Sequence, residues 1–164
     1  MVCVDGFILT HAYERMDVPD QEQVDRFLPP FEPRQVLDPS DPISIGAMVG
    51  PEAFTEVRYM EHHKQMQALE IIPEINKEFK EIFGRDSGGL ISTYRADDAD
   101  TLIVTLGSVI GTISEVIDEM RDKGQKIGAV TIRSFRPFPL DEIHEVLKKT
   151  QRVVVFEKCL AVGL

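Results

Sequence analysis

The side chains best suited to chemistry follow three short apolar runs of the sequence. They are Ser108 after residues 101–106, Arg133 and Arg136 after residues 127–132, and Glu157 with Lys158 after residues 153–156. Guanidinium groups, a hydroxyl and the free backbone amides at the start of a helix all bind anions. One hypothesis is therefore a site for a phosphate or carboxylate group, built from Ser108, Arg133 and Arg136.

A second hypothesis for the same residues is structural. Charged loop residues more often hold a neighbouring domain in place than bind a small ligand. The favoured interpretation is therefore that Arg133 and Arg136 pair with acidic groups of an adjoining domain.

Other patterns that can mark a site are weak in this sequence. Gly107 and Gly111 have the spacing G-x-x-x-G rather than G-x-G-x-x-G, and no acidic residue ends the apolar run 127–132 to hold a ribose. His62 and His63 are adjacent in a helical pattern, where neighbouring side chains point about 100° apart, which disfavours a shared metal ion. No serine or cysteine has a recognisable base nearby in sequence, so we predict no catalytic residue and no metal ligand.

The two cysteines do not form a metal-binding motif. Cys3 and Cys159 stand near opposite ends of the chain, in or beside apolar runs, and are expected to be small buried thiols. An iron–sulfur cluster needs about four cysteine ligands. This segment is therefore not expected to hold a cluster.

Three strands and two helices are predicted to position the first group of residues. The strands are 101–106, 127–132 and 153–156, and the helical stripes are Ile113, Val116, Ile117 and Met120, then Leu140, Ile143, Val146 and Leu147. A capping box at Thr112 and Glu115 is expected to begin the first helix, and Lys123-Gly124 to end it. This order predicts an α/β fold with an open parallel sheet and right-handed crossovers. The carboxyl ends of parallel strands meet at one edge, where Ser108, Arg133 and Arg136 should lie.

A long amphipathic helix is predicted ahead of this sheet. Apolar residues recur at helical spacing from Phe54 to Phe83, with polar residues between them. Pro73 should kink the helix, because proline removes one helical hydrogen bond. Gly84 is the expected stop, and a loop at Gly88-Gly89 is followed by a possible strand, 90–95.

The first third of the chain is rich in proline. Seven of the ten prolines precede residue 52, which excludes a long helix or a central strand between residues 17 and 51. Apolar side chains in this stretch (Phe27, Leu28, Phe31, Val36 and Leu37) predict an extended arm that lies on another surface. Residues 2–5 are expected to end a strand of a sheet that this chain does not supply, so we expect the chain to be part of something larger.

Composition excludes several kinds of partner. The chain has 164 residues, 43% of them hydrophobic, with 18 basic and 28 acidic side chains and a net charge of −10. Such a surface repels nucleic acid and anionic lipid, so neither is an expected partner. No apolar run approaches the ~20 residues of a membrane span, and no signal sequence is evident at the start. We expect a cytoplasmic protein.

Six further motifs follow one another along the chain: VCVDGFILTHAYE (2–14), PDQEQVDRFLPP (19–30), LDP (37–39), EFKEIFGR (78–85), LGSVIGT (106–112) and IRSFRPFP (132–139). In sequence and in order they resemble the α subunits of pyruvate:ferredoxin (flavodoxin) oxidoreductases. The resemblance implies that residues 1–14 end the thiamine pyrimidine-binding domain and that residues 15–53 are a connecting arm. Residues 54–164 would form most of the transketolase C-terminal-like domain II, truncated at its C-terminus.

The resemblance also implies a function for the parent enzyme. Enzymes of this family, which serve anaerobic metabolism, oxidatively decarboxylate a 2-oxoacid on thiamine diphosphate, transfer the acyl group to coenzyme A and pass electrons through iron–sulfur clusters to ferredoxin. Thiamine diphosphate, Mg²⁺, the clusters and coenzyme A would belong to the complex, with none bound by this segment alone. The implied partners are subunits of the β, γ and δ types and ferredoxin or flavodoxin. The family's pyruvate and thiamine contacts lie upstream or in other subunits, so no site residue carries over, and the isolated segment is expected to be inactive.

Two other functions fit part of the sequence. One is a free-standing α/β module that holds coenzyme A or another anion at the arginine-lined edge. The other is a C-terminal domain of a transketolase or deoxyxylulose-phosphate synthase, which fits residues 100–158 but does not explain the proline-rich arm. The choice of pyruvate over 2-oxoisovalerate or 2-oxoglutarate depends on the early motifs. An unpaired sheet edge further predicts self-association of the isolated chain.

Overall fold

The chain divides into two compact units, each described here by itself. The computed structural model describes residues 6, 9–46 and 48–157. One unit is Val18–Arg85, and the other combines Met1–Asp17 with Asp86–Leu164. The strand predicted at residues 2–5 lies outside the described residues, as do Cys3, Cys159 and Lys158. The domain boundaries expected from the family resemblance concern a whole subunit and stay a prediction.

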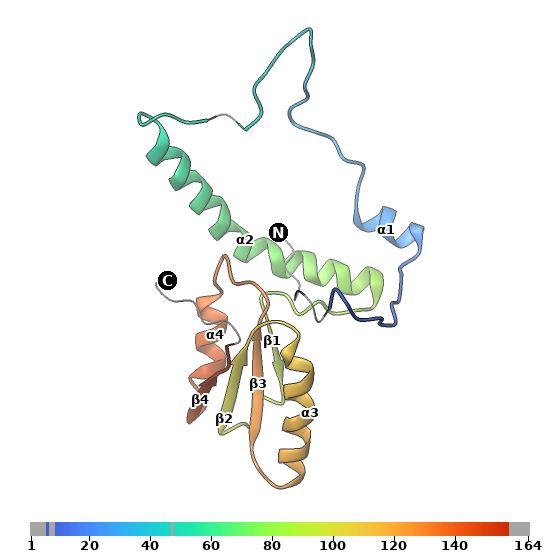
Figure 1. Ribbon diagram of the computed structural model, residues 1–164, viewed down its shortest axis with the longest axis vertical. Helices are drawn as coiled ribbons and strands as arrows, with labels where there is room; N and C mark the ends of the chain where they lie inside the picture. Colours follow the sequence, from blue (N-terminus) through green and yellow to red (C-terminus); the bar gives the residue numbers. More distant parts are fainter. Residues whose placement is uncertain (1–5, 7–8, 47, 158–164) are drawn as a thin grey trace. The chain divides into compact units, whose positions relative to one another are not determined.

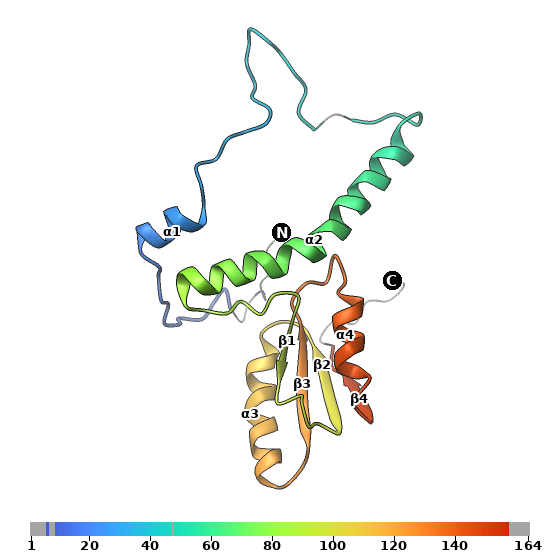
Figure 2. The same ribbon diagram turned by 180° about the vertical axis from the view of Figure 1, so that it is seen from behind.

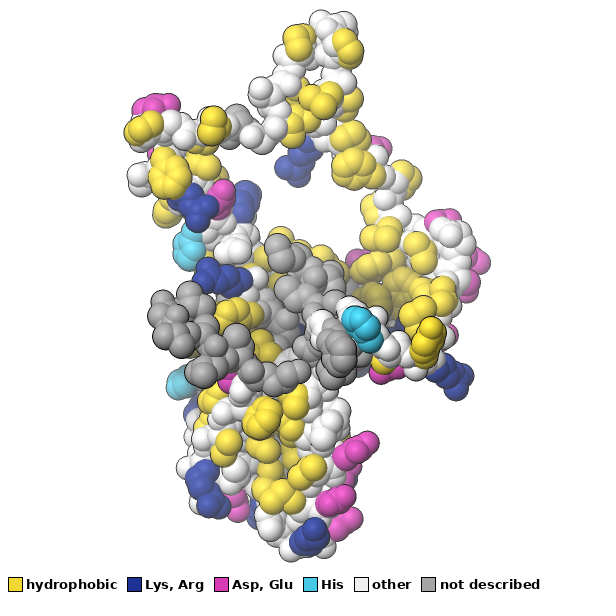
Figure 3. All heavy atoms as spheres, in the orientation of Figure 1, with side chains coloured by type: hydrophobic (Ala, Val, Ile, Leu, Met, Phe, Trp, Pro, Cys, Tyr) yellow, Lys and Arg dark blue, Asp and Glu magenta, His cyan; other side chains and the backbone are white. Residues whose placement is uncertain are grey.

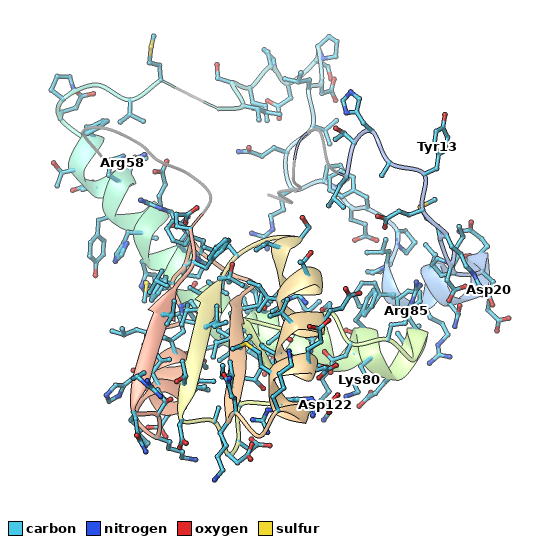
Figure 4. All side chains as sticks on the ribbon, turned by 60° about the horizontal axis from the view of Figure 1, so that its bottom comes forward. Tyr13, Asp20, Arg58, Lys80, Arg85 and Asp122 are labelled. Carbon is cyan, nitrogen blue, oxygen red and sulfur yellow. The ribbon has the colours of Figure 1, made fainter. Side chains whose placement is uncertain are left out.

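Unit Val18–Arg85 contains a short helix that the sequence analysis missed. Helix α1 (Gln21–Phe27) begins at a capping box, in which Asp20 accepts a hydrogen bond from the Gln23 amide at 2.8 Å and the Gln23 side chain accepts one from the Asp20 amide at 3.3 Å. Figure 4 shows Asp20 beside this helix. The Asp-x-x-Gln pattern at residues 20–23 is the feature of the sequence that indicates the start of this helix. The prolines exclude a long helix and predict an extended arm; the extended conformation is wrong for the seven residues of α1.

The long helix has the predicted bounds. Helix α2 covers Phe54–Phe83 and contains Pro73, and its axis bends along its length in Figures 1 and 2, as an interior proline predicts. It ends where Gly84 adopts a left-handed φ of 66° and donates its amide to the Lys80 carbonyl at 2.9 Å. No residue of α2 is buried.

Helix α1 packs on the last turns of α2 through aromatic rings. The Phe27 ring lies edge-on to Phe79 and Phe83, with centroids 5.6 and 5.4 Å apart. The Gln23 side-chain amide also donates to the Ile82 carbonyl at 3.0 Å. These contacts hold the start of the proline-rich segment against α2.

Residues 28–53 form no regular element where they are described, apart from one isolated bridge between Asp38 and Asp41. Seven large apolar side chains of this segment are exposed to solvent: Leu28, Phe31, Val36, Leu37, Ile43, Ile45 and Met48. Phe31, for example, is 88% exposed. The interpretation of this segment as an arm that lies on another surface stays a prediction.

The second unit is built on an open α/β sheet. Its strands are β1 (Ile91–Tyr94), β2 (Thr101–Thr105), β3 (Ile127–Ile132) and β4 (Arg152–Val155), in the spatial order β1-β3-β2-β4. Strand β2 runs parallel to both β3 and β4, which confirms the predicted α/β class and its parallel sheet (Figure 1). The possible strand at 90–95 is β1, and it joins β3 in the antiparallel direction. The sheet is therefore mixed at this one edge.

The two helices of this unit cover opposite faces of the sheet. Side chains alternate along a strand, so Ala129 and Val130 face opposite ways. Val130 belongs to the core cluster with Ile143 of α4 (Leu140–Leu147), whereas Ala129, on the other face, is fully buried together with Ile117 of α3 (Val109–Asp122). Right-handed crossovers in opposite directions, from β2 to β3 and from β3 past β2 to β4, require this arrangement.

Three details of the predicted helices need correction. Helix α3 begins at Val109 with Ser108 as its N-cap, so the capping box expected at Thr112 and Glu115 is wrong. The physical reason is that Gly107 has a φ of 75° and ends the strand directly, which lets the helix begin four residues earlier, with Ser108 rather than Thr112 as its N-cap. Val116 and Leu140, assigned to buried stripes, are 47% and 66% exposed.

Strand β4 is the edge strand on one side of the sheet and is exposed along its whole length. All four of its residues are exposed, among them Val153, Val154 and Val155, and Phe156 after the strand is also 48% exposed. Figure 3 shows hydrophobic side chains gathered on the visible surface of this unit, with acidic side chains along the side that carries α3. Among the described helices, none has the length and apolar character of a membrane span.

Candidate functional site

The carboxyl ends of β2 and β3 form a topological switch point of the sheet. Strands β2 and β3 are neighbours, and their register pairs Thr105 with Thr131, so the segments that follow them leave the sheet at the same level. The segment after β2 leads to α3 on one face, and the segment after β3 leads to α4 on the other. Such a change of direction between adjacent parallel strands is where open α/β sheets collect ligands and partners. The sequence placed Ser108 and Arg133 on the two sides of this point.

Residues Arg133–Pro139, called here the arginine loop, are fastened to the sheet at their start. The amides of Arg133 and Ser134 both donate to the Leu90 carbonyl, at 2.9 and 3.0 Å. The Ser134 hydroxyl then donates across the loop to the Pro137 carbonyl at 2.9 Å. Pro137 and Pro139 are buried. The backbone of the loop is therefore held by its own bonds and by packing of its prolines.

Four side chains of the arginine loop face solvent. They are Arg133, Phe135, Arg136 and Phe138. The two phenylalanine rings contact each other in a T-shaped pair, with centroids 6.2 Å apart and an interplanar angle of 89°. Neither arginine has an ion pair or a side-chain hydrogen bond within the described residues.

A glycine allows the Arg133 side chain to lie against the backbone before β1. A Cβ atom added at Gly88 would lie 3.1 Å from Arg133 Nε and 3.2 Å from the Ser92 Cβ. Gly88 also has a φ of 88°, which favours glycine. The missing side chain thus leaves room for the stem of this arginine, and Gly88 belongs to the candidate site although the sequence marked it only as a loop residue.

Ser108 lies on the other side of this switch point, at the start of α3. It is the N-cap of α3, its side chain makes no capping bond, and its carbonyl accepts a hydrogen bond from the Gly111 amide at 3.1 Å. It lies at the exit of β2, and the two arginines lie at the exit of β3. The structure brings the three predicted residues to one edge, but no hydrogen bond joins Ser108 to either arginine. Whether they bind a ligand or a domain stays a prediction.

The exit of β4 continues the same edge. The Phe156 amide donates to the Val104 carbonyl at 2.9 Å, and the Thr105 hydroxyl donates to the Phe156 carbonyl at 3.3 Å. Thr105 is 1% exposed, so this hydrogen bond satisfies its buried hydroxyl. Glu157, the predicted residue that follows, is therefore carried to the same end of the sheet as Ser108.

Sequence reasoning missed a polar network between α3 and the start of the sheet. Arg121 donates to the carbonyls of Ile127 and Arg95, at 2.7 Å each, and to the Asp98 carboxylate at 2.8 Å. Asp118 accepts from the Tyr94 hydroxyl at 2.9 and 2.8 Å and from Arg95 at 2.7 Å. The only signal in the sequence is that residues 118 and 121 share one face of a helix. Nothing local shows that their partners come from β1 and the loop after it.

The charges of this network shift two pKa values. The hydrogen bond from Arg121 holds the pKa of Asp98 below its ordinary value of 3.8. The neighbouring Tyr94 hydroxyl, and after it the Asp118 carboxylate, raises the pKa of the Arg95 guanidinium. The Arg95 guanidinium therefore stays charged over the physiological range. The network fixes α3 on the sheet.

The structure also describes contacts of His63, which the sequence analysis weighed as a metal ligand, and of His11 near the start of the chain. His63 stacks on the Tyr59 ring, with centroids 6.4 Å apart and an interplanar angle of 7°, on the exposed first half of α2 where Figure 4 labels Arg58. The His11 Nδ1 atom lies 2.9 Å from the Thr10 hydroxyl, and Tyr13 is fully exposed (Figure 4). In the described ranges, no three histidine, cysteine, aspartate or glutamate side chains gather where a metal ion could bind.

Two domain families match the chain in order. "Pyruvate flavodoxin/ferredoxin oxidoreductase, thiamine diP-bdg" matches residues 1–77, and "Pyruvate:ferredoxin oxidoreductase core domain II" matches residues 99–164. The described part of residues 1–77 does not fit thiamine diphosphate and its metal ion, because it offers no buried side chain and no cluster of acidic ligands. No catalytic step is therefore assigned to these residues.

Curated relatives match nearly the whole chain. It is 45% identical over 163 residues to the pyruvate synthase subunit PorA of Methanosarcina barkeri, covering 99% of this chain and 40% of that protein. The same subunit of Methanothermobacter thermautotrophicus is 45% identical over 158 residues, 96% of this chain and 41% of that protein. The ketoisovalerate oxidoreductase subunit VorA of Pyrococcus horikoshii is 37% identical, over 99% of this chain and 42% of that protein.

The chain thus spans about 40% of the length of the curated relatives it matches. A solved structure of 2-oxoglutarate:ferredoxin oxidoreductase from Magnetococcus marinus is similar over 57% of this chain and 16% of that one, with 21% identity and a TM-score of 0.41. The two matching domain families and the identity to PorA subunits agree in order and extent. The chain belongs to the pyruvate:ferredoxin oxidoreductase family, to the α-subunit branch that includes PorA.

Proposed function

We propose that this chain is a structural segment of the α subunit of a pyruvate:ferredoxin oxidoreductase. The parent enzyme would decarboxylate pyruvate oxidatively, transfer the acetyl group to coenzyme A and pass the released electrons to ferredoxin or flavodoxin. The observation that carries this proposal is the 45% identity to pyruvate synthase PorA subunits over 99% of the chain. Thiamine diphosphate, Mg²⁺ and iron–sulfur clusters would be held by other parts of the complex.

The role of this segment in the enzyme would be to position other parts of it. Its exposed apolar surfaces on α2, β4 and the segment 28–53 fit contact with neighbouring domains and subunits. Ser108, Arg133 and Arg136 would hold an adjoining domain at the carboxyl edge of the sheet. The enzyme would work in the cytoplasm, together with other subunits of the β, γ and δ types.

The test of this function uses the full-length enzyme. Purified under anaerobic conditions, it should reduce ferredoxin in a reaction that requires both pyruvate and coenzyme A. Acetyl-CoA should form, and 2-oxoisovalerate and 2-oxoglutarate should give much lower kcat/KM values. An enzyme that releases no acetyl-CoA from pyruvate would contradict the proposal.

A second candidate substrate has its own support. The VorA subunit, whose name describes a ketoisovalerate oxidoreductase, is 37% identical to this chain. If 2-oxoisovalerate gives the higher kcat/KM in the same assay, the enzyme is a branched-chain 2-oxoacid oxidoreductase.

The alternative of a free-standing coenzyme A module is tested by calorimetry. The isolated chain, titrated with coenzyme A, should release no saturable heat. Heat that disappears in Arg133→Ala would favour the binding module instead. Saturable binding of thiamine diphosphate by the isolated chain would contradict the assignment of that cofactor to other parts of the enzyme.

A further inference from the structure

We propose that the arginine loop docks an acidic segment of the same subunit, in the part of the subunit outside these 164 residues. This inference rests on the proposed function, since it requires the longer α subunit. It assigns a specific partner to the loop: a carboxylate-bearing segment with apolar side chains beside its charges. Phe135 and Phe138 belong to this docking surface together with Arg133 and Arg136.

Charge and exposure carry the first step. The chain has a net charge of −10, yet the arginine loop presents two arginines and no acidic residue. Neither guanidinium has an ionic partner within the described part of the chain. Phe135 is 58% and Phe138 is 40% exposed. The charges therefore lie next to apolar surface, and burying that surface against a partner would lower the free energy. Arginine and aromatic residues are the types enriched in the energetic centres of protein interfaces.

Rigidity of the loop is the second step. Two amides fastened to the Leu90 carbonyl, the bond from Ser134 to Pro137 and the buried prolines fix the backbone before any partner binds. A fixed loop loses little conformational entropy on docking. The contact can therefore be favourable even though the loop is short.

Ring geometry favours a protein partner over a nucleotide. A nucleotide site of this kind would stack the base on an exposed ring face and enclose it. The Phe135 and Phe138 rings are perpendicular, at 89°, and contact each other, so they form no pair of parallel faces between which a base inserts. A perpendicular ring pair, each ring partly exposed, suits contact with aliphatic side chains that flank a carboxylate.

The size of the loop favours a partner in the same chain. A stable contact between separate proteins buries about 1,200–2,000 Å² in total, more than one seven-residue loop supplies. A partner on the same polypeptide needs far less area, because the connecting chain keeps its effective concentration high. The curated relatives are more than twice as long as this chain, which covers 40% of one and 41% of another. A partner segment within the same subunit is therefore available.

Hydrogen–deuterium exchange of the full-length subunit in its assembled enzyme tests the proposal. The double variant Arg133→Glu/Arg136→Glu should raise exchange at least about fivefold in one acidic segment outside residues 1–164, because reversed charges open the docked contact. Phe135→Ala should raise exchange in the same segment to a smaller extent. Reversing one carboxylate of that segment to arginine should restore protection in the double variant.

The matched control reverses the charge of two lysines at the opposite end of the strands, just before β3 and β4 begin. Lys123→Glu/Lys149→Glu makes the same change in net charge at exposed positions that have no ion pair among the described residues. It should leave exchange in the acidic segment unchanged. Exchange of β2 and β3 amides reports whether each variant keeps its fold. If the double variant fails to fold, Arg136→Gln provides the same readout with a milder change.

Three outcomes overturn the proposal. Exchange that changes only within residues 1–164 in every folded variant means that the loop docks nothing. A change confined to another subunit means that the partner is a different chain. Protection of the loop in the wild-type enzyme by added coenzyme A means that it is a ligand site. The proposed function is judged separately, by pyruvate-dependent acetyl-CoA formation in the wild-type enzyme.

Discussion

At the scale of single residues, Gly128 is a position where an added methyl group would meet backbone atoms of the neighbouring strand. It lies in β3, and a Cβ atom there would be 2.4 Å from the Arg95 carbonyl oxygen and 2.9 Å from the Tyr94 oxygen. Both are backbone atoms, which cannot relieve the clash by a change of rotamer as a side chain can. We expect Gly128→Ala to lower the free energy of unfolding by about 3 kcal/mol or to separate β1 from β3.

Gly111 provides the matched control for this substitution. It lies inside α3, and a Cβ atom added there meets no atom within 4 Å. Alanine is the better helix former, so Gly111→Ala should raise the free energy of unfolding by up to about 1 kcal/mol. Urea unfolding of both variants measures the difference. Equal stability in the two variants would show that β1 does not approach β3 as described.

The Arg121 network gives stability that depends on pH. The pKa of Asp98 is lowered in the folded state by its hydrogen bond from Arg121, so ionised Asp98 favours folding. This contribution is fully present above the ordinary value of 3.8 and is lost as the pH falls through the lower folded-state pKa. Asp98→Asn should therefore destabilise the chain at neutral pH and have little effect well below pH 3.8.

The control for this pH dependence is the adjacent Asp97, which has no ion pair among the described residues. Urea titrations of wild type, Asp98→Asn and Asp97→Asn at several pH values make the comparison. A stability difference between wild type and Asp98→Asn that stays constant down to acidic pH would contradict the network.

At the scale of secondary structure, the α1–α2 contact depends on one ring. Phe27 lies edge-on to both Phe79 and Phe83, and the Gln23 side chain donates to the Ile82 carbonyl. No residue of α1 is buried, so the helix depends on these contacts with α2. A seven-residue helix is too short to persist without such packing. Phe27→Ala should therefore raise hydrogen exchange of the α1 amides at least about tenfold.

Phe31→Ala is the control for that variant. Phe31 is 88% exposed and has no ring contact among the described residues. The same loss of an aromatic side chain four residues along the chain should leave exchange of the α1 amides unchanged. If both variants deprotect α1 equally, the contact with α2 does not stabilise this helix.

Local sequence patterns predicted most of these helices and strands, because each depends mainly on residues that are close together in the sequence. The period of 3.6 and the left-handed Gly84 determine α2, and unbroken apolar runs determine β2 and β3, with bounds within one residue. The antiparallel pairing of β1 and the partners of Arg121 were not predictable in this way. Both depend on contacts between residues that are distant in sequence, such as Ile91 with Ile132.

The candidate site was predictable in part for the same reason. Strand order placed Ser108, Arg133 and Arg136 at one edge, because parallel strands share the direction in which they end. The exposure of Phe135 and Phe138 was not evident, since aromatic residues beside an apolar strand are more often buried. The loop's hydrogen bonds to Leu90 required β1 to lie beside β3, which the sequence did not establish.

At the scale of the whole molecule, the unpaired edge strand β4 favours self-association of the isolated chain. The amides of Arg152 and Phe156 point to β2, so those of Val153 and Val155 point away from the sheet and are free to pair with another strand. Two β4 strands paired antiparallel about Val154 would place Val153 opposite Val155. Arginine would face phenylalanine, and no like charges would meet.

We therefore expect the 164-residue chain, produced alone, to form dimers or larger species. Val155→Lys should shift it toward monomer, because a charged side chain on an edge strand opposes pairing, and at 73% exposure the lysine fits the fold of the unit itself. Val116→Lys, on the exposed face of α3, is the matched control, since it adds the same charge away from the edge. Light scattering over a range of concentrations gives the mass of each variant. A wild-type chain that stays monomeric at the highest concentration would show that the apolar surface of β4 does not suffice for association, and equal masses for the two lysine variants would place the contact elsewhere.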